Sequence, residues 1–111
     1  MSTYYSSLKF LNFSDQINAI SKGDIVAPVH IRVKPINLCN HNCWYCAYRT
    51  DNVTLGDDMN DKDQIPKEKM VELAHEFVDM GVKAVTFSGG GEPLLYKPLP
   101  EIIEILAQGG I

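Results

Sequence analysis

The sequence predicts an α/β fold in which two parallel strands alternate with two helices. Three observations support this prediction: two short apolar stretches of strand length, two longer stretches with apolar residues at helical spacing, and the alternation of the two kinds along the chain. Strands that are joined through a helix run parallel, and the helices then cover the sheet. A chain of 111 residues, 45% of them hydrophobic, suits one small domain.

The chain divides into an N-terminal extension, residues 1–28, and the βαβα domain, residues 29–111. The extension carries a short helical pattern that Ser14 can cap and Gly23 can end. No other structure is predicted for the extension.

The first strand is predicted from Val29 to Lys34, where apolar and polar residues alternate. This alternation places Arg32 and Lys34 on the polar face, which turns either toward the interior of a barrel or toward solvent. The second strand is predicted from Val82 to Phe87, a short apolar stretch typical of a strand that is covered on both faces.

The first helix of the domain is expected to begin at Pro66 and to stop at Gly81. The last helix is expected from about Pro98 to Gln108, with Gly109 ending it. Each has an apolar stripe at the helical spacing that faces the sheet. The inward residues are Met70, Leu73, Ala74, Phe77 and Val78 in the first of these helices and Leu99, Ile102, Ile103 and Leu106 in the second.

All three cysteines fall in one short segment with the spacing Cys39-x3-Cys43-x2-Cys46. Thiolates are soft metal ligands, and an odd number of cysteines this close together is a poor disulfide framework. Iron–sulfur cubes usually take four cysteines, so three leave one iron open to another ligand. Zinc held by the cysteines with His41 or His75 is the alternative, although the spacing fits no ordinary zinc motif.

The segment from Cys39 to Cys46 resembles the signature of the radical S-adenosylmethionine (SAM) superfamily, which has three cysteines at this spacing and an aromatic residue before the third. The resemblance implies that Cys39, Cys43 and Cys46 bind a [4Fe-4S] cluster and that SAM chelates the remaining iron. It also implies that Tyr45 packs near the SAM adenine. Trp44 is expected to be a core residue.

A glycine-rich segment, Ser88-Gly89-Gly90-Gly91-Glu92-Pro93, follows the second strand directly. Consecutive glycines let the backbone approach a ligand closely, although a tight turn between strand and helix is the alternative. The segment is similar to the Gly-Gly-Glu motif of the same family, which implies that Gly89, Gly90, Gly91 and Glu92 lie at the SAM amino group. Loops after parallel strands open on the same edge of a sheet, so this loop is expected beside the cysteines.

The resemblance covers roughly residues 29–111 and implies the N-terminal βαβα portion of a partial (β/α)6 TIM-like barrel, truncated after two units. The implied activity is reductive cleavage of SAM to a 5′-deoxyadenosyl radical that abstracts hydrogen from an unknown substrate. Flavodoxin or ferredoxin is the implied electron donor, and the 111 residues are expected to be inactive alone. The competing function is a non-catalytic iron–sulfur or zinc binding module.

Charge and hydropathy narrow the possible partners. The formal net charge is -4, which argues against nucleic acid because phosphate binding favours a basic face. No apolar stretch has the length of a membrane span, and the first residues do not read as a signal peptide. The sequence therefore predicts a cytoplasmic protein.

Overall fold

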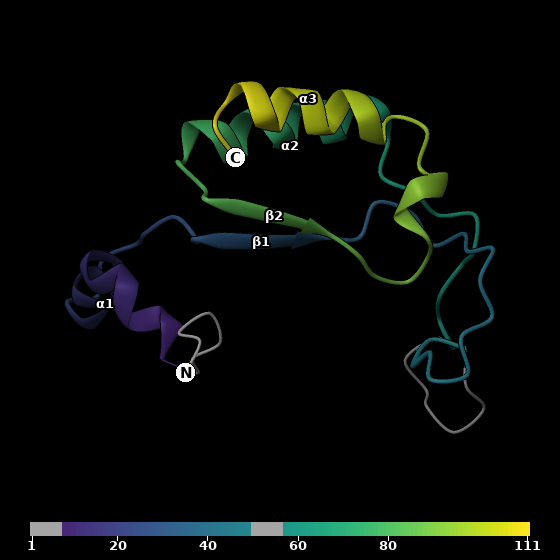
Figure 1. The fold of residues 1–111 in the computed structure, drawn as a ribbon, viewed down its shortest axis with the longest axis horizontal. Helices are drawn as coiled ribbons and strands as arrows, with labels where there is room; N and C mark the ends of the chain where they lie inside the picture. The colour runs from purple at the N-terminus through teal and green to yellow at the C-terminus, as the bar shows by residue number, and fades with distance from the viewer. Residues whose placement is uncertain (1–7, 50–56) are drawn as a thin grey trace, which may run out of the picture.

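The computed structural model describes residues 8–49 and 57–111, and within them it has a parallel two-stranded sheet with α-helices beside it (Figure 1). Two short 3₁₀-helices, at the start of the extension and after the second strand, were not anticipated from the sequence. In chain order the elements are η1 (Lys9–Phe13), α1 (Ser14–Ser21), β1 (His30–Val33), α2 (Lys67–Asp79), β2 (Ala84–Phe87), η3 (Pro93–Leu95) and α3 (Leu99–Gln108).

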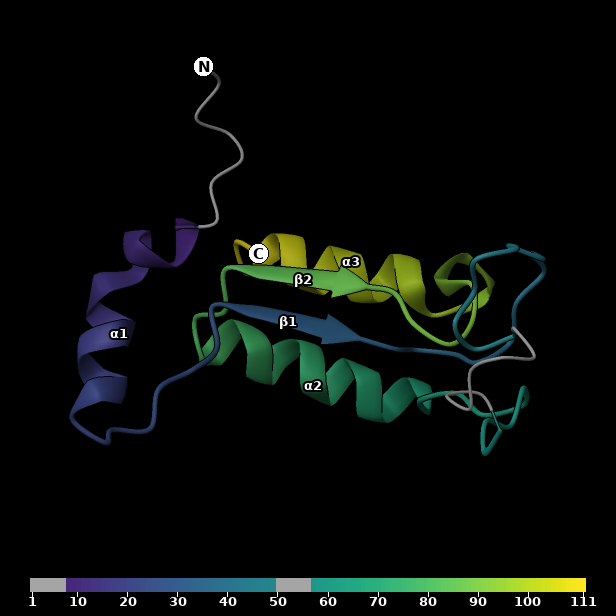
Figure 2. The same ribbon diagram turned by 90° about the horizontal axis from the view of Figure 1, so that it is seen from below.

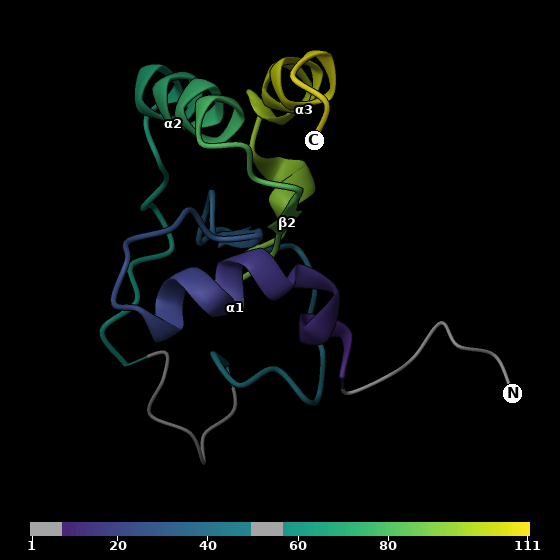
Figure 3. The same ribbon diagram turned by 90° about the vertical axis from the view of Figure 1, so that its left-hand side faces the viewer.

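The two strands pair in parallel, as the alternation of strands and helices predicts. His30 lies opposite Ala84 and Val33 lies opposite Phe87, so the strands are in register over their whole length. Helices α2 and α3 lie side by side on one face of this sheet (Figures 1 and 3). The βαβα order is therefore confirmed within the described residues.

A hydrophobic core fills the space between the sheet and the two helices. Met70 from α2 and Ile102 from α3 are both 0% exposed, so the helical stripes meet at the centre of this layer. Alternation along β1 and β2 turns every second strand residue into the same core. The buried hydrophobic residues are Val33, Ile36, Met70, Ala74, Phe77, Val82, Tyr96, Leu99, Ile102 and Leu106.

The opposite face of the sheet is open (Figure 2). His30, Arg32, Ala84 and Thr86 lie on this face and are all exposed. The expectation that the second strand is covered on both faces is therefore wrong for the described residues. The physical reason is that α2 and α3 lie on the same side of the sheet, which leaves the other side without a helical layer.

Several helix boundaries and one inward residue differ from expectation. Ser14 is the first residue of α1 and makes no capping hydrogen bond, so it is not the cap. Pro66 and Pro98 precede α2 and α3 as N-caps instead of opening the helices. Ile103 is 49% exposed, because the apolar arc of α3 is wider than the surface that α2 and β2 cover.

Helix α1 stands beside the beginnings of the strands and buries none of its residues (Figure 3). Gly23 follows it with a φ of 83°, a backbone conformation that glycine adopts readily, and so it ends the helix as expected. Among the described residues, no helix is long and apolar enough to cross a membrane.

Candidate functional site

The loops that follow β1 and β2 meet at the carboxyl edge of the sheet, as the parallel topology predicts (Figure 1). The N–H of Glu92, in the glycine loop, donates to the carbonyl oxygen of Leu38 at 2.9 Å. Leu38 directly precedes Cys39. The glycine loop is thus bonded to the first residue ahead of the cysteine segment.

Gly91 makes this close approach possible. A Cβ atom added to Gly91 would lie 2.5 Å from the backbone carbon of Asn37 and 2.6 Å from the carbonyl oxygen of Ile36. Both are backbone atoms, so neither can swing aside as a side chain could. The glycine at this position is therefore required by the packing of one loop on the other.

The other two glycines have different surroundings. Gly89 has a φ of 128°, where a side chain is strained, and it lies against the side chain of Lys34. Gly90 is buried beneath the side chains of Met59 and Asn37. Within the described part of the chain, the N–H and C=O groups of these glycines and of Gly91 make no hydrogen bond to protein.

Gly89 and Gly91 border an open cavity of about 540 Å³. Its volume lies in the range of small-molecule binding sites. The cavity extends from the glycine loop past Phe87, the last residue of β2, to Leu99 and Ile103 of α3. The glycine loop thus offers unpaired hydrogen-bonding groups to a space that could take a ligand.

Glu92 connects the two loops through its side chain. One carboxylate oxygen accepts from the N–H of Leu94 at 3.0 Å and so caps η3. The other lies 3.3 Å from Nε2 of His41, between the first two cysteines. His41 therefore joins the cysteine loop to the glycine loop, and both carboxylate oxygens of Glu92 contact protein groups in this structure.

The cysteine segment itself has little regular structure. The N–H of Cys46 donates to the carbonyl of Cys43 at 3.0 Å, and the N–H of Arg49 donates to the carbonyl of Cys46 at 3.1 Å. All three cysteines are free thiols, with Cys43 exposed and the other two half-buried. None of the three therefore takes part in a disulfide in this structure.

The three thiols do not converge in this arrangement of the loop. Across residues 8–49 and 57–111, no group of three or more Cys, His, Asp and Glu side chains lies close enough together to hold a metal ion. The donor set nevertheless fits an iron–sulfur cluster, because three soft thiols, none of them in a disulfide, share one short loop. Metal sites commonly form only as the metal binds, since unpaired ligands have no reason to gather.

Two aromatic side chains project from the same loop. Trp44 is 87% exposed and Tyr45 is 70% exposed, and their ring centroids are 5.4 Å apart in an edge-to-face pair. The expectation that Trp44 is a core residue is wrong, because the loop extends beyond the sheet and no described element covers it. The exposure of Tyr45 leaves it free to contact a ligand beside the cysteines.

Sequence reasoning missed the side chains that fasten the cysteine loop at its ends. Asn37 donates from its side-chain amide to the carbonyl of Asn60 at 3.0 Å, and its own N–H donates to the carbonyl of Asp63 at 2.9 Å. Lys34 donates to the Tyr48 hydroxyl at 2.5 Å. No motif marks these residues, because their roles depend on segments that are distant in the sequence.

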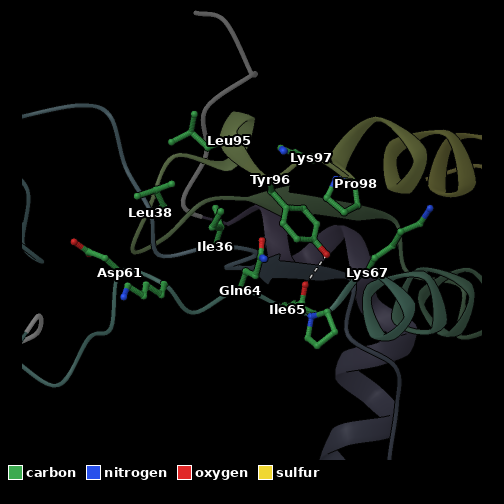
Figure 4. Close-up of a pocket in the computed structure, with 12 residues that line it drawn as sticks. Ile36, Leu38, Asp61, Gln64, Ile65, Lys67, Leu95, Tyr96, Lys97 and Pro98 are labelled. Atoms are coloured by element: carbon green, nitrogen blue, oxygen red, sulfur yellow. Dashed lines mark hydrogen bonds between the residues drawn. The ribbon is translucent and has the colours of Figure 1, made fainter.

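A second cavity, of about 560 Å³, lies between the start of the cysteine loop and the beginnings of α2 and α3 (Figure 4). It is lined by Ile36 and Leu38 on one side and by Leu95 and Tyr96 on another, and contains neither a cysteine nor a glycine. The Tyr96 hydroxyl donates to the carbonyl of Ile65 at 2.8 Å. Burial raises the pKa of this phenol, with the charge of Glu68 a smaller cause.

Comparisons with known proteins match most of this chain. The family model of the radical SAM superfamily matches residues 33–110. A probable GTP 3′,8-cyclase of Archaeoglobus fulgidus is 35% identical over 74 residues, which is 67% of this chain and 22% of that protein. The GTP 3′,8-cyclase of Helicobacter pylori is 36% identical over the same number of residues and the same shares.

A third relative covers more of the chain. The [FeFe] hydrogenase maturase subunit HydE of Thermotoga maritima is 30% identical over 102 residues, 88% of this chain and 27% of that protein. The chain thus spans about a quarter or less of the length of these relatives. No solved structure matches the chain. Because the family model matches most of its length, across the cysteine and the glycine loops, this chain belongs to the radical SAM superfamily, whose enzymes use a [4Fe-4S] cluster and SAM.

Proposed function

We propose that this chain carries the cluster-binding and SAM-binding loops of a radical SAM enzyme, on the first two βα units of a partial (β/α)6 barrel. The observation that carries the proposal is the contact between Gly91 and the backbone of residues 36–38. It keeps the glycine loop against the start of the cysteine loop. The loop proposed to bind the cluster and the loop proposed to bind SAM are thereby held together.

In this proposal Cys39, Cys43 and Cys46 are the ligands of the cluster. Three thiolates leave one iron of a [4Fe-4S] cluster without a protein ligand, which is where SAM binds in this family. All three cysteines are at least partly exposed and none is in a disulfide, so the thiolates can gather around the cluster as it assembles. The alternative, a zinc or non-catalytic iron–sulfur module, uses the same thiolates and gives no role to the glycine loop.

The SAM contacts are assigned to the segment Gly89–Glu92 and to Tyr45. The glycines contribute free N–H and C=O groups next to an open cavity, which suits an ammonium group and a carboxylate. Tyr45 presents an exposed ring for the adenine. Glu92 also holds His41 and η3 in place and so helps to fix the shape of the glycine loop.

The cluster and SAM, when bound, supply reductive cleavage. With an electron from a donor of the flavodoxin or ferredoxin class, this chemistry would convert SAM to methionine and a 5′-deoxyadenosyl radical able to take a hydrogen atom from a substrate. The residues of this chain hold the reactants and fix their orientation, which must be kept to within about half an ångström. We expect the 111 residues alone to be inactive, because that precision needs a supporting shell beyond two strands.

The test is anaerobic reconstitution with iron and sulfide, followed by Mössbauer spectra and by iron and zinc analysis. Cys39→Ala, Cys43→Ala and Cys46→Ala should each abolish the cluster. Asn42→Ala, in the same loop, changes no thiol and should retain it. Tightly bound zinc with no iron, or a cluster that survives in Cys43→Ala, would contradict the proposal.

SAM binding is tested separately, in the full natural polypeptide. Tyr45→Ala should weaken SAM binding by about tenfold, the order of one lost aromatic contact, and leave the iron content unchanged. Unchanged SAM affinity would remove Tyr45 from the site. Dithionite-driven formation of 5′-deoxyadenosine then separates an enzyme from a non-catalytic cluster module, since only the enzyme cleaves SAM.

A further inference from the structure

The open face of the sheet carries an unusual set of side chains for an acidic chain. Alternation along β1 places His30 and Arg32 on this face, and Lys34 continues the alternation just beyond the strand. Their neighbours across the sheet are Ala84 and Thr86, which have no charge. A row of basic groups thus crosses one face of a chain whose formal net charge is -4.

The hydrogen-bond partners of this row leave one cation free. His30 bonds to the Thr86 hydroxyl at 2.8 Å, and Lys34 is held by Tyr48 through its hydroxyl and its ring. Within the described part of the chain, Arg32 makes neither a hydrogen bond nor an ion pair to a side chain. An exposed guanidinium with five donors is well suited to a carboxylate or a phosphate.

The row also leads to the candidate cofactor site. Lys34 lies against Gly89 of the glycine loop and against Tyr48, two residues after Cys46. In Figure 2, this face lies in front of α2 and α3, and α1 stands beside it at the beginnings of the strands. A molecule lying on the face beside Arg32 would therefore extend toward the glycine and cysteine loops.

We propose that this face binds an anionic small molecule through Arg32 and Lys34, and that the substrate of the enzyme carries a carboxylate or phosphate group. The assignment to the substrate rests on the proposed function, in which the face opposite the helices is the interior of the barrel. Charge complementarity selects the class of ligand: two cations, one without a partner, and no acid among the strand residues of this face. His30 and Thr86 add neutral hydrogen-bonding groups along the same row.

The test uses the full natural polypeptide without its cluster, titrated by calorimetry with pyrophosphate and, separately, with citrate. Arg32→Gln should weaken the binding of at least one of the two anions by about tenfold, as expected for one charge-assisted hydrogen bond, and Arg32→Gln with Lys34→Gln by more. The control is Lys83→Gln, which removes the same charge from the exposed residue that directly precedes β2. It should change the affinity by less than about twofold, within the size of screened surface effects.

Three results would overturn the proposal. The first is the absence of binding of either anion at millimolar concentration; the second is an equal loss in Arg32→Gln and Lys83→Gln, which would indicate net charge alone. The third is complete displacement of the anion by SAM in the reconstituted protein, which would assign the cations to the SAM carboxylate instead of to a substrate. Because the first two results come from titrations that need neither iron nor SAM, failure of the cluster assignment would leave them unaffected.

Discussion

Two regions of the molecule, the sheet covered by α2 and α3 and the loop that carries the cysteines, differ most in what their side chains contact. In the first region Met70 and Ile102 are fully buried, and both helices take their positions from an apolar stripe. In the cysteine loop, Trp44 and Tyr45 are largely exposed and the thiols do not converge. Burial of apolar surface stabilises the first region, whereas the second is fastened only at its ends.

This difference shows where the free energy of each region comes from. Apolar burial is a property of the chain alone, so the core can form without a partner. A metal-binding loop takes its final shape from the metal, because thiols gain nothing by gathering without it. We therefore expect mutations in the core to change stability and mutations in the loop to change cofactor binding with little effect on stability.

The largest expected effect on stability comes from Ile102→Ala. Ile102 of α3 is fully buried in the core between the helices and the sheet, so truncating its side chain should lower the free energy of unfolding by about 2–5 kcal/mol. The matched control is Ile103→Ala on the same helix, which is half exposed and should cost under about 1 kcal/mol. Urea unfolding followed by circular dichroism measures both, and equal losses would mean that the core is not where this structure places it.

The next effect lies at the junction of the two regions. Gly91→Ala would push a methyl group into the backbone of residues 36–38, and we expect a loss of about 1–3 kcal/mol, as for other overpacked sites. Gly90→Ala meets the flexible side chain of Met59 and the amide of Asn37, so its cost should be smaller. Gly91→Ala should also lower the iron content after reconstitution. If Gly90→Ala proved the more damaging in both measurements, the contact between the loops would not be the feature that joins them.

A smaller effect, dependent on pH, is expected at Tyr96, which is 1% exposed. Tyr96→Phe removes the hydrogen bond to Ile65 and should cost about 1 kcal/mol at pH 7. Burial raises the pKa of Tyr96 above its ordinary value of 10.0, so the unfolded chain loses this proton first as the pH rises. The stability that the phenol contributes is full below pH 10.0 and is lost as the pH rises through the folded pKa.

Unfolding measured from pH 7 to pH 11 tests this prediction. The difference between the wild-type protein and Tyr96→Phe should narrow above about pH 10, because only the wild type carries this buried phenol. The other tyrosines are present in both proteins, so their contributions cancel in the difference. A difference that stays constant or widens with pH would contradict the assignment of a buried, hydrogen-bonded phenol.

The smallest effect on stability is expected within the loop itself. Cys43 and Trp44 are exposed, so Cys43→Ala and Trp44→Ala should each change the free energy of unfolding of the metal-free chain by less than about 0.5 kcal/mol. Cys43→Ala should nevertheless abolish the cluster, which Trp44→Ala should not. A loss above about 1 kcal/mol in the metal-free chain would show that the loop is packed more tightly than the structure indicates.

The sequence by itself determined the order of the elements and the parallel pairing of the strands. The spacing of the apolar residues in 70–78 and 99–106 predicted both helices, and Gly23 and Gly81 marked helix ends correctly, with φ angles of 83° and 72°. These features are local, because helical and strand periodicities follow from the backbone geometry of a few residues. The three cysteines and the glycine loop were likewise visible as motifs, and their adjacency followed from the topology.

Only the tertiary structure decided which faces are covered and which residues join the loops. Ile103 fits the stripe of α3 as well as Ile102 does, yet Ile102 is 0% exposed and Ile103 is 49% exposed. The open face beside Arg32, the exposure of Trp44 and the contact of Gly91 with residues 36–38 each depend on segments far apart in the sequence. No periodicity encodes such contacts, because they depend on where the neighbouring elements lie in space.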